Sequence, residues 1–298
     1  MVMKDGGAPQ GASEDAGPST AAQAHLEGWF AGAGGLSLFR RTWRPDGPTT
    51  AILINVHGLG DHSGLYPTLV EHFTARGIAV YAPDLRGNGR SPGQRAYVER
   101  WDEYREDLER FVAVVRREEP GRPIFLLGNS LGGLIVLDYA VHTPEGIRGV
   151  IAASPPLGRI GVPAPLLALG RVLSRVWPRF SVRTRMDLSG LARDPVVAET
   201  VLSDPLFHRV GTARLSTEVV AAIARVQAAA PRFPLPLLVL HGSADRMVPP
   251  DGSRAFVARV GHADRELREY AGAFHVLFAD LDRERALTDV EQWIAARL

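Results

Sequence analysis

The feature that most constrains the fold of this chain is a regular alternation of short, wholly apolar segments with longer segments of helical periodicity. The apolar segments are residues 51–56, 78–81, 124–127, 150–153 and 237–240. Strands without a polar face are buried on both sides, as in a parallel sheet covered by helices. The helical patterns span residues 66–76, 101–117, 131–142, 253–260 and 283–298. The alternation predicts an α/β fold with a mostly parallel, doubly wound central sheet.

The alternation fails between Pro155 and Phe233, where no strand pattern stands out. A helical pattern at 215–230 remains, so we predict a mainly helical insertion between two core strands. Loops at the carboxyl ends of parallel strands line the ligand crevice, and an insertion there is well placed to form a lid. The expected organisation is a disordered tail (1–24), a core (25–154 and 234–298) and a lid (155–233).

A candidate nucleophile lies in Gly128-Asn129-Ser130-Leu131-Gly132, which matches the G-x-S-x-G pattern of a nucleophile elbow. Ser130 follows the apolar segment 124–127 and precedes the helical pattern 131–142. The elbow requires this strand–turn–helix context, in which small residues let the strand and the helix pack closely. The sequence therefore predicts Ser130 as the nucleophile of an acyl-transfer reaction.

A second match, Gly89-Arg90-Ser91-Pro92-Gly93, lacks that context. No strand immediately precedes Ser91, and Pro92 has no backbone N–H. The residue after the nucleophile must donate its N–H to the oxyanion, so Ser91 fails on chemistry as well. We expect the segment from Asp84 to Ser91 to be structural, with Asp84 and Arg86 paired across a turn.

Acyl transfer also needs two N–H donors aimed at the developing oxyanion. The residue after the nucleophile, Leu131, supplies one, and a loop after an earlier strand supplies the other. His57-Gly58-Leu59-Gly60 follows the apolar segment 51–56, and the glycines allow the Leu59 amide to turn into the site. We predict Leu59 and Leu131 as the oxyanion hole, with His57 hydrogen-bonded within its loop.

The acidic member of a Ser–acid–His triad follows the serine in the chain. Asp245 lies directly after the apolar segment 237–240, on the same sheet edge as Ser130. Asp251 is the competing candidate, but Pro249-Pro250-Asp251 is more typical of a helix start. The sequence predicts Asp245 as the acid.

The base must come later still, after one more strand. Residues 266–271 form a modest strand pattern, and His275 follows it. From that position His275 can reach Ser130 with one ring nitrogen and Asp245 with the other. His262 precedes the strand and lies on its wrong side, so we predict His275 as the base.

Composition excludes other classes of function. Lys+Arg total 34 against Asp+Glu 33, and a net charge of +1 gives no bulk attraction to nucleic acid. The absence of cysteine excludes disulfides, thiolate nucleophiles and cysteine zinc sites. Neither a long apolar run nor a secretory signal pattern is present, so we expect a cytoplasmic protein, with peripheral membrane contact through the lid as a hypothesis. We expect neither a metal nor a cofactor.

With these residues in place, the chain resembles the monoacylglycerol lipase and lysophospholipase group of the α/β-hydrolases. The resemblance runs from about Gly28 to the C-terminus. It is carried by His57-Gly58-Leu59-Gly60-Asp61-His62-Ser63-Gly64, Asp84-Leu85-Arg86-Gly87-Asn88-Gly89-Arg90-Ser91, the elbow at Ser130, Ser203-Asp204-Pro205-Leu206, Gly242-Ser243-Ala244-Asp245-Arg246 and Ala271-Gly272-Ala273-Phe274-His275-Val276-Leu277. It implies the α/β-hydrolase fold and hydrolysis of lipid-like esters.

The chain departs from the group at three positions. Members often carry His or Leu at the position of Asn129. They often carry Met at the position of Leu131, a change that a backbone donor tolerates. Val201 matches the neighbourhood of a lid tyrosine that animal members are thought to turn toward the glycerol headgroup. The last difference argues against a strict preference for glycerol esters.

The lid segment 162–176 is rich in leucine and valine, with arginines interspersed. Such a helix could line an acyl tunnel and touch a membrane or micelle, and the alternative is a helix packed on the core. We expect substrate contacts from Leu59, Leu166, Leu167, Val201 and Val248.

These inferences favour a serine hydrolase that cleaves monoacylglycerols into fatty acid and glycerol. Lysophospholipase and broad carboxylesterase activities use the same triad and remain alternatives. A peptidase would need acidic groups for a free amino terminus, for which Glu199 and Glu218 are single candidates. A non-catalytic receptor or scaffold on this fold is a more distant alternative, since such proteins commonly lose a triad member.

Overall fold

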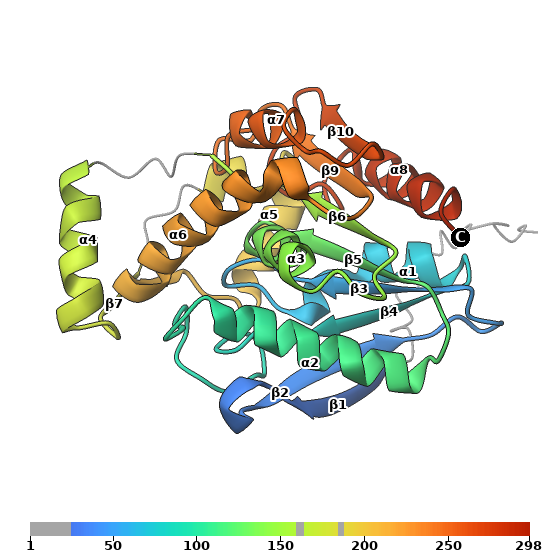
Figure 1. The fold of residues 1–298 in the computed structure, drawn as a ribbon, viewed down its shortest axis with the longest axis horizontal. Helices are drawn as coiled ribbons and strands as arrows, with labels where there is room; N and C mark the ends of the chain where they lie inside the picture. The colour runs from blue at the N-terminus through green and yellow to red at the C-terminus, as the bar shows by residue number, and fades with distance from the viewer. Residues whose placement is uncertain (1–24, 159–163, 184–187) are drawn as a thin grey trace, which may run out of the picture.

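The centre of the molecule is an eight-stranded sheet in the order β1-β2-β4-β3-β5-β6-β9-β10 (Figure 1). The computed structural model describes residues 25–158, 164–183 and 188–298, and the expected tail at 1–24 lies outside them. The strands are β1 (Leu26–Ala31), β2 (Ser37–Trp43), β3 (Ala51–Val56), β4 (Ile78–Pro83), β5 (Ile124–Asn129), β6 (Gly149–Ala153), β9 (Leu237–Gly242) and β10 (Arg265–Tyr270). The six strands from β4 to β10 in this order run parallel, which confirms the predicted mostly parallel sheet.

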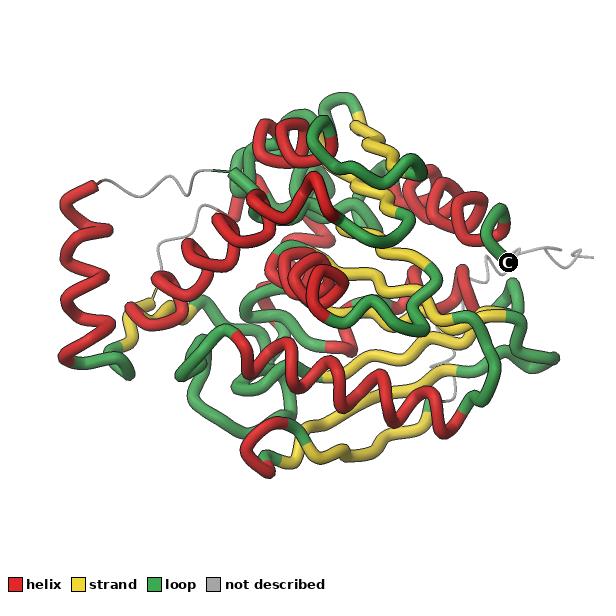
Figure 2. The backbone as a smooth tube through the Cα atoms, viewed as in Figure 1, coloured by secondary structure: helices red, strands yellow, loops and turns green. Residues whose placement is uncertain are grey.

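Helices cover both faces of this sheet (Figure 2). Strand residues alternate between two apolar cores, so that Ile52 and Ile54 face one and Ala51 and Leu53 face the other. The first core is closed by α2 (Asp102–Glu118), α3 (Leu131–His142) and α7 (Asp251–Val257), and the second by α1 (Pro67–Thr74) and α8 (Arg283–Ala295). Burial on both sides explains why β3, β4 and β9 carry no exposed residue.

The antiparallel pair β1–β2 extends the sheet at one edge and was not predicted. β1 lies at the outside of the sheet and only Phe30 of its six residues is buried, so its sequence lacks the uniform apolar signature. Edge strands of this kind need only one buried face.

The segment between β6 and β9, predicted to be a mainly helical insertion, contains three helices in its described part. Its described elements are α4 (Ala164–Val176), β7 (Ser181–Arg183), α5 (Pro195–Ser203), β8 (Val210–Thr212) and α6 (Ala213–Ala229), with 3₁₀ turns at Leu188–Gly190 and Ala230–Arg232. β7 and β8 pair antiparallel outside the main sheet. At three residues each, they are too short to show a period of two in the sequence.

The carboxyl ends of four parallel strands meet at one edge of the sheet. The chain leaves β3 into the Gly58 loop, β5 at Ser130, β9 toward Asp245 and β10 toward His275. This is the edge at which open α/β sheets bind ligands. The fold therefore gathers there the residues that the sequence analysis selected.

Candidate active site

Ser130 occupies a sharp turn between β5 and α3. Its backbone has φ 52° and ψ −117°, a left-handed conformation that residues other than glycine adopt rarely. The turn requires very close packing, because a Cβ on Gly128 would lie 2.2 Å from the Gly132 carbonyl oxygen. The Ser130 N–H donates to the Ala153 carbonyl of β6 at 2.8 Å, which fixes the turn against the sheet. This geometry presents the Ser130 side chain at the edge of the sheet.

Ser130 lies in the wall of a cavity of about 440 Å³. His275, Leu59, Val201 and Val248 line the same cavity. The remaining wall is mainly apolar and includes Leu65, Leu191, Val196, Val197, Phe207, Met247, Val276 and Phe278. Three of the five predicted substrate contacts thus face the cavity, while the side chains of Leu166 and Leu167 lie outside the described part of the chain.

Asp245 is buried and accepts hydrogen bonds at both carboxylate oxygens. Oδ1 accepts from the backbone N–H groups of Met247 and Val248, each at 2.9 Å. Oδ2 lies 2.7 Å from Nδ1 of His275 and 3.4 Å from Nε2 of His241. Burial alone would raise the pKa of Asp245, but the hydrogen bonds from His241, His275 and Val248 outweigh it and lower the pKa well below the ordinary value. The carboxyl group is therefore ionised.

His275 follows β10 and is tied to the lid and the core through its backbone. Its N–H donates to the Gly190 carbonyl at 3.3 Å, and its carbonyl accepts from the Ser154 hydroxyl at 2.9 Å. Because Asp245 is ionised, Nδ1 carries the hydrogen that it donates to Oδ2. Nε2 of the neutral ring is consequently left as the basic nitrogen.

The Gly58–Leu59 peptide is oriented by His57, which is fully buried. Nε2 of His57 accepts the Leu85 N–H at 2.9 Å, so Nδ1 carries the hydrogen and donates to the Gly58 carbonyl at 2.8 Å. Burial lowers the pKa of His57, consistent with this neutral form. In a trans peptide the N–H points opposite to the carbonyl, so the Leu59 N–H is directed away from His57.

The second predicted donor, Leu131, is the first residue of α3. The first N–H groups of a helix have no partner within the helix, so this amide is available to a ligand. The two loops lie close together, since a Cβ on Gly58 would lie 3.3 Å from Cβ of Ser130. The loop of the first predicted donor therefore lies against the residue that precedes the second.

The expected pairing of Asp84 with Arg86 is wrong. Arg86 instead forms a buried ion pair with Asp107 of α2, with Nε and Oδ2 2.6 Å apart, and a second with Glu103 at 2.9 Å. Asp84 accepts the backbone N–H groups of Ser63 and Arg90, both at 2.8 Å. The segment is structural as expected, but Arg86 joins it to a helix rather than closing its own turn.

Sequence reasoning missed two polar residues in the cavity wall, Asp61 and Tyr66. The Tyr66 hydroxyl donates to Oδ2 of Asp61 at 2.5 Å, while Oδ1 accepts the His62 N–H at 2.7 Å. Asp61 lies within the segment from His57 to Gly64, which carries part of the family resemblance. That segment was the sequence signal that could have identified Asp61 as a site residue. These two side chains place polar groups in the mainly apolar wall of the cavity.

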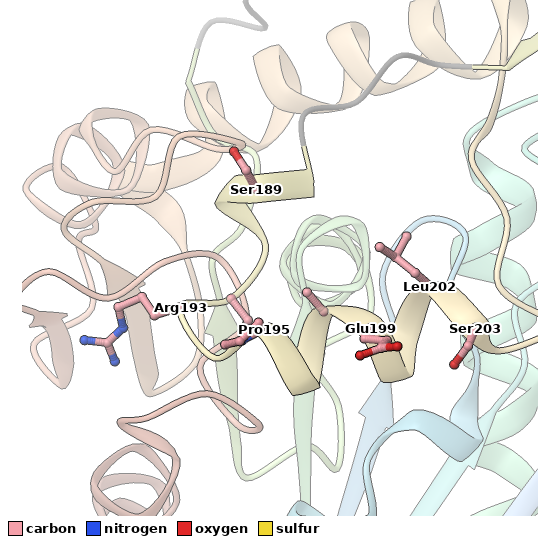
Figure 3. A pocket seen from close by; sticks show the side chains of 8 residues that line it. Ser189, Arg193, Pro195, Glu199, Leu202 and Ser203 are labelled. Carbon is pink, nitrogen blue, oxygen red and sulfur yellow. The ribbon is translucent and has the colours of Figure 1, made fainter.

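A second, more open cavity of about 600 Å³ lies on the other side of α5 (Figure 3). Ser189, Arg193, Pro195, Glu199, Leu202 and Ser203 line it, and none of them lines the cavity at Ser130. Arg193 is held by Asp280 at 3.1 Å and by Asp282 at 2.5 Å. Glu199, one of the single acidic candidates for a peptidase, therefore faces away from Ser130.

These features define the class of protein. A mostly parallel sheet that carries a serine on a strained strand-to-helix turn, with a histidine paired to a buried aspartate in the wall of the same cavity, is typical of the α/β-hydrolases. None of the described helices is long and apolar enough to cross a membrane.

Comparison with known proteins identifies the family. A family model described as serine aminopeptidase, S33, matches residues 47–282. The chain is 32% identical over 274 residues to the monoacylglycerol lipase of Mycolicibacterium smegmatis, across 90% of this chain and 96% of that protein. It is 32% identical over 270 residues to the monoglyceride lipase of Homo sapiens, across 89% of each. The crystal structure of Paleococcus ferrophilus monoacylglycerol lipase matches with a TM-score of 0.79 and 34% identity, covering 88% of this chain and 99% of that one.

The chain therefore belongs to the monoacylglycerol lipase group of the α/β-hydrolases, as its sequence motifs indicated. It is a carboxylic ester hydrolase.

Proposed function

We propose that this enzyme hydrolyses monoacylglycerols to a fatty acid and glycerol with Ser130, Asp245 and His275 as its triad. The observation that carries the proposal is the 2.7 Å contact between His275 Nδ1 and a buried, ionised Asp245, with His275 and Ser130 in the wall of one apolar cavity. An ionised acid on Nδ1 leaves Nε2 to act as the base.

The reaction proceeds by two acyl-transfer steps. Nε2 of His275 takes the hydroxyl proton of Ser130 as Oγ attacks the ester carbonyl. Asp245 stabilises the imidazolium, and the amides of Leu59 and Leu131 bind the oxyanion of the tetrahedral intermediate. His275 then protonates the leaving glycerol, which yields the acyl-enzyme. A water molecule activated by His275 releases the fatty acid.

The apolar wall supports an acyl chain as one part of the substrate. Leu59, Val201 and Val248 lie among its apolar residues, and each buried methylene contributes about 0.8 kcal/mol. We assign these three residues to acyl contact. A substrate with a longer saturated chain gains affinity until the cavity is filled.

The polar groups of Asp61 and Tyr66 in the cavity wall support a hydroxylated headgroup. Asp61 uses one lone pair on each oxygen for Tyr66 and His62, so further lone pairs can accept glycerol hydroxyls. A hydrogen bond to a charged group contributes about 1.5–3 kcal/mol. Asp61→Leu should therefore raise KM for a monoacylglycerol roughly 10- to 100-fold. It should leave KM unchanged for the ethyl ester of the same fatty acid, which offers no headgroup hydroxyl.

We also propose that the lid contacts lipid surfaces transiently. α4 stands at the margin of the molecule, away from the sheet (Figure 1). Leu169, Val172, Val176 and Trp177 are each more than half exposed along this helix and its end. The exposed arginines Arg171 and Arg175 lie beside them, as in helices that rest at a membrane interface.

The first test measures fatty acid release from mono-, di- and triacylglycerols of matched chain length, with Ser130→Ala as the control. Release confined to the monoacylglycerol, and lost in the variant, is the expected result. Equal release from all three would instead identify a general esterase. Release that survives Ser130→Ala would overturn the nucleophile. Because the matching family model is named for an aminopeptidase, leucine p-nitroanilide is included as a substrate and should not be cleaved.

A further inference from the structure

The part of the lid that follows α5 crosses directly over the loop that carries Leu59. The backbone N–H of His208 donates to the Gly60 carbonyl at 3.0 Å. The approach is so close that a Cβ on Gly60 would lie 2.1 Å from the His208 carbonyl oxygen. Gly60 also has φ +78°, so this residue must be glycine for both conformational and steric reasons.

The His208 side chain makes a second connection to the same loop through Asn88. Oδ1 of Asn88 lies 2.8 Å from Nε2 of His208 and accepts the Gly60 N–H at 3.3 Å. Asn88 is fully buried, and its Nδ2 donates to the Arg86 carbonyl at 3.0 Å. That bond fixes the amide orientation, so Oδ1 faces Gly60 and His208.

The remaining contact of His208 settles which ring nitrogen carries the hydrogen. Nδ1 lies 3.3 Å from the Val210 backbone N–H, which only an unprotonated nitrogen can accept. Nε2 therefore carries the hydrogen and donates it to Asn88. His208, Asn88 and Gly60 form a closed set of hydrogen bonds, which we call the loop clasp.

The loop clasp lies one residue from the proposed oxyanion donor and one residue from the substrate cavity. Gly60 follows Leu59 directly, and Phe207, which precedes His208, lines the cavity. A second tie holds the same lid segment, since Asp204 lies 3.2 Å from Nε2 of His62. The lid segment 204–208 and the Gly58–Gly60 loop are thus joined by several polar contacts.

We propose that His208 is a positioning residue for the oxyanion hole, through which the position of the lid sets the placement of the Leu59 amide. This inference rests on the proposed acyl-transfer function. His57 fixes the Gly58 carbonyl on one side of Leu59, and the loop clasp fixes Gly60 on the other. With both flanking peptides held, the Leu59 N–H has one direction. Loss of the clasp frees one of the two flanks.

The experiment compares His208→Ala and His208→Leu with His208→Gln. Leucine keeps much of the volume without a donor, whereas a glutamine amide reaches about as far as Nε2 and can still donate to Asn88. Full loss of one oxyanion donor costs about 10²- to 10³-fold in kcat. Because the Leu59 amide is displaced rather than removed, we expect kcat to fall about 10-fold or more in Ala and Leu, with KM within about 3-fold. Glutamine should restore most of the kcat.

A trifluoromethyl ketone with an acyl-like chain provides the readout that a purely structural role would not change. It forms a tetrahedral adduct with the nucleophile, so its inhibition constant should rise in parallel with the fall in kcat. The inhibition constant of the corresponding fatty alcohol, which forms no oxyanion, should not change. Rates are expressed per active site titrated with a fluorophosphonate, so misfolded protein does not contribute. His142→Ala, at the end of α3, is the matched histidine control.

The outcomes separate this inference from the proposed function. An unchanged kcat in His208→Ala and His208→Leu would overturn the positioning role. So would a fall in kcat that glutamine does not restore, or one without weaker binding of the ketone. The proposed function itself is tested by Ser130→Ala in the same assay. If this variant kept the activity of the wild type, the triad would be refuted regardless of the results for His208.

Discussion

Replacement of Gly132 by alanine tests the strained turn that holds the proposed nucleophile. A Cβ there would lie 2.1 Å from the Val56 carbonyl oxygen and 2.6 Å from that of His57. Ordinary contact begins at 3.4 Å, so β3 or α3 must shift by about an ångström. Neither obstructing atom can rotate away, because both belong to buried backbone. Overpacking of this kind costs about 1–3 kcal/mol, and we expect the upper part of that range.

Gly133 provides the matched control, because it is the next residue of the same helix. A Cβ at Gly133 would lie 3.1 Å from Cβ of Pro155 and 3.2 Å from the Gly128 carbonyl oxygen, which small adjustments can relieve. Both substitutions gain about 1 kcal/mol of helix propensity. The difference in stability between the two variants therefore reports the collision at Gly132 alone.

The two variants are compared by thermal unfolding and by kcat on a monoacylglycerol. At about 2–4 °C for each kcal/mol in a chain of this size, Gly132→Ala should lower Tm by roughly 4–8 °C, while Gly133→Ala stays within about 3 °C. The shift at Gly132 also displaces Val56 and His57, which lead into the Leu59 loop. An ångström of misplacement costs about 10²-fold in rate. Equal Tm and kcat in the two variants would refute the reasoning.

Four further outcomes are expected. Asp245→Asn should lower kcat by about 10⁴-fold, as in other triads. Because hydrogen bonds keep the pKa of the native Asp245 carboxylate low, wild type loses stability as the pH falls below the ordinary aspartate pKa, and the variant should lose less. Burial, with a smaller effect of the nearby Arg95 charge, lowers the pKa of His208 from 6.5 to about 4. Lowering the pH from 6.5 to 4 should therefore destabilise wild type by about 1 kcal/mol more than His208→Gln, after allowance for solvent screening. Asp107→Leu leaves Glu103 as the remaining ion-pair partner of the buried Arg86 and should cost about 3 kcal/mol in urea unfolding. Trp177→Ser should reduce flotation with lipid vesicles, whereas Trp29→Ser, equally exposed on β1, should not.

The parallel core could be predicted because its strands are buried on both faces and are therefore apolar throughout. The segments 51–56, 124–127 and 237–240 all became strands of the central sheet. β1 could not be predicted in the same way, because a strand with one exposed face lacks this signature. β7 and β8 escaped prediction because three residues are too few to establish a period.

The positions of the site residues could be predicted because they depend on chain order relative to strands. Ser130, Asp245 and His275 each follow a parallel strand, and parallel strands end at one edge. Contacts that join distant segments left no such pattern. The sequence predicts that Arg86 pairs with Asp84 within one turn, but its partner Asp107 lies on α2, 21 residues away. A spacing of two residues is visible in a sequence, whereas the packing of a helix against that turn is not.

The two serine motifs show how burial and hydrogen bonding decide what a short pattern means. Ser91 is buried, and its hydroxyl accepts the Phe39 N–H at 2.8 Å and donates to the Asp84 carbonyl at 2.7 Å. The hydrogen of this hydroxyl is directed at a buried carbonyl rather than at a base, and its oxygen is turned toward β2 rather than toward a cavity. Ser130 has the same two flanking glycines but lines the cavity that His275 also lines. The glycines around Ser130 make room for backbone, while Gly89 lies with φ +52° against Asp84 and serves only to close a turn. The identical pattern thus has opposite consequences, and the difference lies in whether a strand delivers the serine to the open edge of the sheet.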